Sequence, residues 1–218
     1  MNDPQRAGSA VTTDRRYGGN SAIGDPGDPA ESASARPDTR ARIQQVAVEL
    51  FTEHGYDGTS LREIAERLEV TKAALYYHFK SKEDIVASLM EDYAQKMDAL
   101  IAWGREQPRN ARTRRELLSR YVDIVAESGQ VFRMLHQNQA AVSTLSSAKT
   151  RGELFKERIG SLIDLLSEPD ASLAARVKAA MAIGGISASW MFFSGQMDKG
   201  ELTEAIRAIA TGIAEMPF

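Results

Sequence analysis

The stretch SLREIAERLEVTKAALYYHF, residues 60–79, decides how the rest of the chain is interpreted. Its first half places apolar side chains at Leu61, Ile64 and Leu68, the spacing of one face of a short helix. After a break at residues 69–70, Thr71 can cap a second helix that ends near Phe79. Two short helices joined by a tight turn predict a helix-turn-helix, whose second helix lies in the major groove of DNA.

Capping patterns place the neighbouring helices. A helix is expected from residue 38 or 39 to 54, with Gly55 suited to the left-handed position that follows a helix. Ser60 and Ser81 each precede an acidic residue by three positions, the spacing of a capping box. The second box opens a helix with an apolar stripe over about five turns, which ends between Gly104 and Pro108.

The remaining chain shows only helical periodicity. Further helices are expected at 114–127, 130–139, 153–166, 170–194 and 201–214, with Ser128-Gly129 as one of the breaks. The sequence therefore predicts an all-α protein of about nine helices, in which a three-helix helix-turn-helix domain (38–82) joins a larger helical domain (83–218). Residues 1–37 are rich in Gly, Ser, Ala, Asp and Pro, a composition that predicts a disordered extension.

Composition excludes several functional classes. The net charge of −3 provides no global basic field, so attraction to DNA must come from a local arrangement of cations. The chain has no cysteine, and its three histidines (His54, His78 and His136) lack metal-ligand spacing, so neither a metal nor another cofactor is expected. No G-x-S-x-G, P-loop or G-x-G-x-x-G motif is present, and we expect no enzyme activity.

Nothing in the sequence predicts a membrane location. The start of the chain lacks a signal-peptide pattern. Residues 179–197 carry no charge, but glycine and serine dilute their hydropathy, which favours a buried helix over a membrane span. A cytoplasmic protein is expected.

The segments TSLREIAERL (59–68) and TKAALYYHFKSKEDI (71–85) resemble the N-terminal signature of the TetR family of bacterial repressors. The resemblance covers residues 39–86 and is most specific in LYYHF and the following KSKE. Beyond it, the chain matches the family only in length and helical pattern. Glu69 stands where the family usually has glycine, and a non-glycine residue in that left-handed turn position costs roughly 1 kcal/mol.

Contacts with DNA are expected along the second helix of the motif. Ala73 and Ala74 allow close approach of the backbone, and Lys72 can reach a guanine edge or a phosphate. The resemblance implies phosphate contacts by Tyr76, His78 and Lys82 and by Thr59 or Ser60, and base contacts by Tyr77 and Arg62. Alternatives remain: Arg62 can simply pair with Glu66, and His78 can cap or pack. Lys82 can be an ordinary solvated charge, and one of the two tyrosines can be a core aromatic. The expected DNA-contacting residues are Thr59, Ser60, Arg62, Thr71, Lys72, Ala73, Ala74, Tyr76, Tyr77, His78 and Lys82.

The resemblance also implies a homodimeric repressor that a small organic effector releases from a palindromic operator in double-stranded DNA. The helices at 170–194 and 201–214 are the expected dimer interface, because the first contains many small residues and the second an apolar stripe. The alternative is that both helices only complete the core of one subunit. Candidate effector-binding residues are polar, aromatic or flexible side chains within apolar helices: Met97, Trp103, Tyr121, Arg133, His136, Gln137, Trp190 and Phe193.

Overall fold

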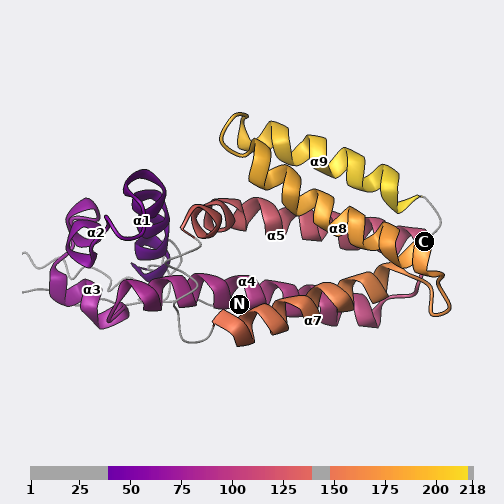
Figure 1. The fold of residues 1–218 in the computed structure, drawn as a ribbon, viewed down its shortest axis with the longest axis horizontal. Helices are drawn as coiled ribbons and strands as arrows, with labels where there is room; N and C mark the ends of the chain where they lie inside the picture. The colour runs from indigo at the N-terminus through magenta and orange to yellow at the C-terminus, as the bar shows by residue number, and fades with distance from the viewer. Residues whose placement is uncertain (1–38, 139–147, 216–218) are drawn as a thin grey trace, which may run out of the picture. The chain divides into compact units, whose positions relative to one another are not determined.

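The computed structural model describes residues 39–138 and 148–215, which form eight helices (Figure 1). They are α1 (Thr39–His54), α2 (Leu61–Arg67), α3 (Lys72–His78), α4 (Lys82–Glu106), α5 (Ala111–Gln137), α7 (Ala148–Leu166), α8 (Leu173–Phe193) and α9 (Lys199–Ala214). The all-α prediction is confirmed. The extension expected at 1–37 and the end of the helix expected at 130–139 lie outside the described residues.

Helix starts follow the capping residues. Ser81 accepts a hydrogen bond from the Asp84 backbone N–H, and the Asp84 side chain accepts one from the Ser81 N–H in return, so this capping box is complete. α8 and α9 are capped by a side chain alone. Ser172 accepts from the Ala175 N–H, and Asp198 accepts from the N–H groups of Gly200 and Glu201. α4 continues two residues past Gly104, to Glu106.

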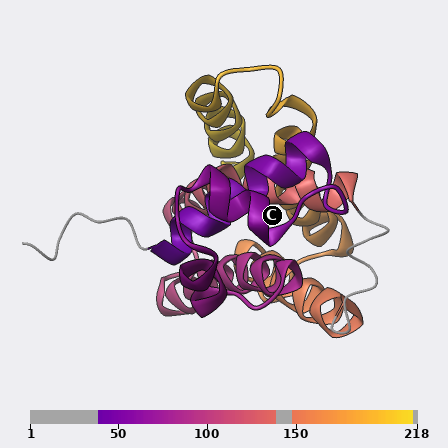
Figure 2. The same ribbon diagram turned by 90° about the vertical axis from the view of Figure 1, so that its left-hand side faces the viewer.

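Two hydrophobic clusters organise the described helices. The smaller is built by α1, α2 and α3 around Phe51, Ile64 and Leu75. The larger is built by α4, α5, α7, α8 and α9. Both α4 and α5 contribute to both clusters, because Ile85 at the start of α4 and Met134 near the end of α5 pack into the smaller one. The domain boundary expected at residue 82 stays a prediction. Figure 2 looks onto the end at which α1–α3 lie.

One predicted break was wrong: α5 runs without interruption through Ser128-Gly129. Both residues are buried, and a Cβ atom added to Gly129 would lie 2.7 Å from Cε3 of Trp190 on α8. Glycine is therefore required for the close approach of an indole ring, and it does not end the helix here. The roughly 1 kcal/mol that glycine costs inside a helix is offset by this packing.

The apolar segment tested as a membrane span lies mainly in α8, which packs against α5, α7 and α9. Among the described helices, none combines the length and hydropathy that crossing a bilayer requires.

Candidate nucleic-acid interface

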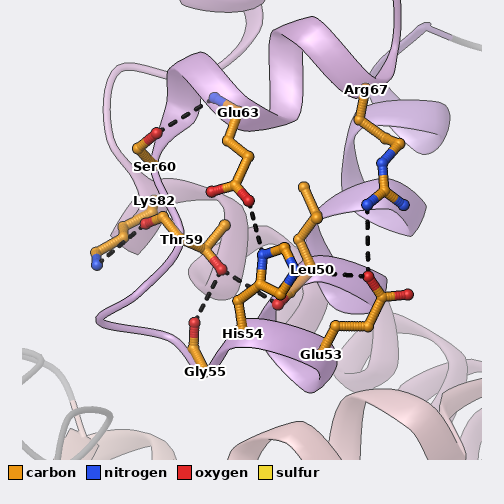
Figure 3. Close-up of polar contacts among 9 residues, drawn as sticks. All are labelled: Leu50, Glu53, His54, Gly55, Thr59, Ser60, Glu63, Arg67 and Lys82. Atoms are coloured by element: carbon orange, nitrogen blue, oxygen red, sulfur yellow. Dashed lines mark hydrogen bonds and ion pairs between the residues drawn. The ribbon is translucent and has the colours of Figure 1, made fainter.

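The turn between α1 and α2 is held by hydrogen bonds from a side chain to the backbone (Figure 3). The Thr59 hydroxyl donates to the carbonyl oxygens of Leu50, at 3.2 Å, and Gly55, at 2.8 Å. Gly55 has a φ of +79°, the left-handed conformation predicted for it. Thr59 is only 3% exposed, so its side chain fixes the entry into α2.

Ionisable side chains connect α2 to the end of α1, as Figure 3 also shows. Nδ1 of His54 lies 2.7 Å from Oε1 of Glu63, and Nη2 of Arg67 lies 3.5 Å from Oε2 of Glu53. Ser60 caps α2 by accepting from the Glu63 N–H at 3.2 Å. The Glu63 carboxylate turns to His54 instead of the Ser60 backbone, so only one half of the capping box predicted here forms.

The turn between α2 and α3 adopts the left-handed geometry expected of it without a glycine. Glu69 has a φ of +56°. The Val70 N–H donates to the Ala65 carbonyl at 3.0 Å, and the Glu69 N–H donates to the Glu66 carbonyl at 3.2 Å. These are the two bonds of a Schellman motif, which satisfies the last carbonyls of α2 and redirects the chain into α3.

α3 buries one face and leaves the other in solvent. Thr71 caps it by accepting from the Ala74 N–H at 3.1 Å. Leu75 and Phe79 are 0% and 2% exposed. Tyr77 is 79% exposed, the largest value for any bulky hydrophobic side chain in the part of the chain that the structure describes. The exposed residues of this face, which we call the α3 outer face, are Lys72, Ala73, Ala74, Tyr76 and Tyr77.

Two other predicted contacts have partners within the protein. Nε of Arg62 lies 2.6 Å from Oε1 of Glu66, so the alternative of a local ion pair is realised. Water screens this exposed i,i+4 pair, so the pair is weak and a base contact can replace it. His78 is half-buried, with its ring edge against Tyr77 at a centroid distance of 5.3 Å.

Lys82 holds the turn that precedes α2. Its Nζ donates to the carbonyl oxygens of Tyr56, at 2.7 Å, and Thr59, at 3.4 Å. The same Nζ lies 4.3 Å from the centroid of the Tyr56 ring, within cation–π range. An ammonium group has three N–H donors, so two are already engaged. A phosphate contact by Lys82 stays a prediction that would use the third.

A cavity of about 350 Å³ lies in the larger helical cluster. Its lining residues come from four helices: Tyr93, Gly129, Phe132, His136, Phe155, Ser187, Ala188, Trp190 and Met191. Tyr93 packs edge-on against Phe132 at a centroid distance of 4.8 Å and stacks on Phe155 at 6.2 Å. Ser187 brings a hydroxyl to the lining, and its Oγ is 2.7 Å from the hydroxyl of Tyr121. An apolar, aromatic wall with few polar groups is typical of a site for a small organic molecule.

The structure brings only two of the predicted effector residues, His136 and Trp190, into the lining of this cavity. Met97 and Tyr121 are fully buried in the surrounding core, where burial raises the pKa of Tyr121. Cζ of Arg120 lies 4.1 Å from the centroid of the Trp103 ring, and both side chains line a different pocket. Arg133, Gln137 and Phe193 are not among the lining residues.

Comparison with known proteins is consistent with the geometry of the N-terminal helices. A profile described as "Bacterial regulatory proteins, tetR family" matches residues 43–89, from α1 into α4. Residues 43–89 therefore form the N-terminal domain of the TetR family. The HTH-type transcriptional activator FasR of Mycolicibacterium smegmatis is 24% identical over 187 residues, covering 81% of this chain and 83% of FasR. The HTH-type regulator AcrR of Shigella flexneri is 44% identical over 54 residues, a quarter of each chain.

Solved structures of TetR-family regulators share the fold. A regulator of the TetR/AcrR type from Aquifex aeolicus aligns with a TM-score of 0.61 at 24% identity, covering 81% of this chain and 99% of its own. KstR2 of Mycobacterium tuberculosis aligns with a TM-score of 0.60 at 17% identity, covering 83% and 96%. These likenesses show the all-helical fold, and the match of residues 43–89 indicates a DNA-binding transcriptional regulator.

The phosphate contact expected of Thr59 or Ser60 stays a prediction. The Thr59 hydroxyl is buried and bonded to two carbonyls, so this side chain is directed inward. Ser60, the other residue considered at that position, is exposed. Sequence reasoning could not separate the two, because both are small hydroxyl residues and only the path of the α1–α2 turn decides which points inward.

Seven lining residues lie outside the candidate set given above: Tyr93, Gly129, Phe132, Phe155, Ser187, Ala188 and Met191. Their spacing identifies them as helical and mostly apolar, which is the pattern of any core position. No signal in the sequence tells which inward-facing residues leave a hollow between them.

Proposed function

We propose that this protein binds an approximately palindromic DNA operator as a homodimer in the cytoplasm and represses transcription until a small organic effector binds. The observation that carries the proposal is the α3 outer face. Lys72, Tyr76 and Tyr77 face solvent while Leu75 and Phe79 anchor the helix from behind. Tyrosines exposed to this extent contribute little to the described fold, whereas cations, hydroxyls and small residues in one row suit phosphates and base edges.

Dimerisation through α8 and α9 is supported by apolar side chains that no described helix covers. Leu173, Met181 and Phe192 on α8 and Ile209 on α9 are 78%, 71%, 65% and 66% exposed. Between the α8 side chains, Gly184 is exposed and has open space where a Cβ would be. A second copy packed against this surface would remove these side chains from water and place two α3 helices on one duplex. Half-sites about 34–36 Å apart, or a multiple of that spacing, are then expected.

The effector site is proposed to be the cavity lined by Tyr93, Phe132, Phe155 and Trp190. Its volume of about 350 Å³ suits a compact apolar molecule. Tyr93 lies on α4, which continues from the smaller hydrophobic cluster into the larger one. An effector that displaces α4 would change the separation of the two α3 helices. A coupling of about 1–3 kcal/mol gives about 5–150-fold weaker operator binding.

Activation is the second candidate mode of regulation. FasR, aligned over 187 residues, is named an activator, whereas IcaR of Staphylococcus epidermidis, 46% identical over 51 residues, is named a negative regulator. A reporter placed behind the selected operator separates the two: deleting the regulator raises expression if it represses and lowers expression if it activates.

Selection of bound DNA from a random pool tests the proposal. A palindromic consensus is expected, with clearly weaker binding to one isolated half-site and a steep loss of affinity as salt rises. Equal affinity for the full site and the half-site would contradict a dimer. Met181→Arg is expected to yield monomers in light scattering because it buries a charge in the interface, whereas Gln95→Arg, on an exposed part of α4, should leave the dimer intact.

A further inference from the structure

Tyr56, in the turn between α1 and α2, is connected to three other helices through different parts of one residue. Its N–H donates to Oδ1 of Asn138 at 2.9 Å, and its carbonyl accepts from Nζ of Lys82 at 2.7 Å. Its hydroxyl donates to Oε1 of Glu83 at 2.7 Å. Its ring packs on Phe51 at a centroid distance of 5.2 Å. The residue is 4% exposed, so the turn that leads into α2 is fixed against both the start of α4 and the end of α5.

Residues 129–138, the last part of α5 and its C-cap Asn138, contact different parts of the protein on two opposite faces. We call them the α5 terminal segment. Gly129, Phe132 and His136 line the cavity. Met134, fully buried, packs into the cluster of α1–α3, and Asn138 bonds to Tyr56. At about 100° per residue, the first set lies on nearly the opposite side of the helix from the second. One short rigid element therefore touches the cavity on one side and the DNA-binding helices on the other.

Asn138 is held with little freedom at the end of this segment. Its Nδ2 donates to the Met134 carbonyl at 2.8 Å, and its backbone N–H donates to the same carbonyl at 3.0 Å. These bonds leave Oδ1 directed at the Tyr56 N–H. A flipped amide would place two donors against each other, so the orientation of the side chain is determined by its partners. Any shift or rotation of the α5 terminal segment must move Tyr56 or break this hydrogen bond.

We propose that Asn138 is a positioning residue for DNA binding, which fixes α2 and α3 through Tyr56 and couples them to the cavity wall on α5. The inference rests on the proposed function and adds a second route to the displacement of α4. It assigns a role to a residue that touches neither DNA nor the cavity. Coupling between sites is reciprocal, so operator DNA must influence the α5 terminal segment as strongly as an event in the cavity influences α3. The proposal can therefore be tested without knowing the effector.

The test is amide hydrogen exchange of the full-length protein, free and bound to the operator selected from the random pool. In the natural protein, DNA is expected to slow exchange in α3 and also to change exchange at residues 130–137 by about fivefold or more, the lower end of typical coupling. In Asn138→Ala, the effect on α3 should remain while the effect on residues 130–137 falls below about twofold. Asn138→Leu, which keeps the branching at Cγ without the amide, takes the place of Asn138→Ala if the alanine variant does not fold.

Two further variants complete the test. Gln137→Ala, the matched control, alters the exposed neighbouring residue and should retain the natural response. Asn138→Asp keeps an acceptor for the Tyr56 N–H but places a second oxygen against the Met134 carbonyl, so it should also weaken the response at residues 130–137. An unchanged α5 terminal segment in the natural protein, or an equal response in Asn138→Ala, would overturn this proposal while leaving the proposed function standing. Failure to select any DNA would overturn both.

Discussion

Tyr77→Ala is the substitution that most directly tests the α3 outer face. The Tyr77 side chain is 79% exposed and makes its one aromatic contact within the described residues with the His78 ring. Tyrosine at this position therefore contributes little to the fold. If the side chain reaches a base edge in the major groove, its removal must weaken operator binding while leaving the protein folded.

The two expected magnitudes differ enough to be separated. A fully buried tyrosine covers about 150–250 Å², so the buried fifth of Tyr77 is about 30–50 Å², worth about 1 kcal/mol. The better helix propensity of alanine offsets about 0.5 kcal/mol of this loss. The net destabilisation of about 0.5 kcal/mol lowers Tm by about 1–2 °C. Loss of a base contact costs about 1–3 kcal/mol in each half-site. Two half-sites in a dimer make this about 2–6 kcal/mol, or about 30-fold to 10⁴-fold in Kd, if the sites are additive.

Fluorescence anisotropy with the selected operator and with unrelated DNA measures both effects, and thermal denaturation monitors the fold. The loss should be confined to the operator, because nonspecific binding depends on phosphates. Tyr77→Phe separates the roles of ring and hydroxyl without changing the volume. An operator Kd within about twofold of the natural protein, with Tm unchanged, would show that α3 does not read bases through Tyr77.

Three further results are expected. Lys72→Ala should cost about 1–3 kcal/mol only at matching sequences if Lys72 contacts a base, whereas a phosphate contact predicts a uniform loss and a salt slope smaller by about 1. Glu69→Gly should stabilise the protein by up to about 1 kcal/mol in urea unfolding, because the left-handed φ costs a non-glycine residue about 1–2 kcal/mol and glycine costs about 0.5–1 kcal/mol in unfolded-state entropy; a loss of stability would refute the strain. The hydrogen bond from Tyr56 lowers the pKa of Glu83, so this carboxylate stabilises the fold above its ordinary value of about 4.3 and loses that effect as the pH falls through the lowered folded value. The free energy of unfolding in urea should therefore fall less for Glu83→Gln than for the natural protein between about pH 7 and about pH 3. Identical pH profiles would contradict the hydrogen bond.

Local chemistry made much of the DNA-binding unit predictable from the sequence. Thr71, Ser81 and Asp84 act on backbone groups three residues away, so their capping roles need no tertiary information. The inward positions of Leu75 and Phe79 follow from the spacing of the motif itself, whereas the left-handed turn at Glu69 was implied by the resemblance to the TetR family. The residues of the α3 outer face follow in turn, because a helix with one buried side must expose the other.

Contacts between residues distant in the chain were decided only by the tertiary structure. Gly129 looks like a helix break until Trp190 of α8 is placed against it. The inward direction of the Thr59 hydroxyl likewise depends on the two carbonyls that accept its hydrogen bond. The bond from Tyr56 to Asn138 spans 82 positions, and no local pattern specifies it. Periodicity determines which side of a helix is apolar, since that depends on neighbours within two turns. It cannot determine which two apolar sides meet or where they leave a cavity, because that depends on how side chains from separate helices fill a shared space.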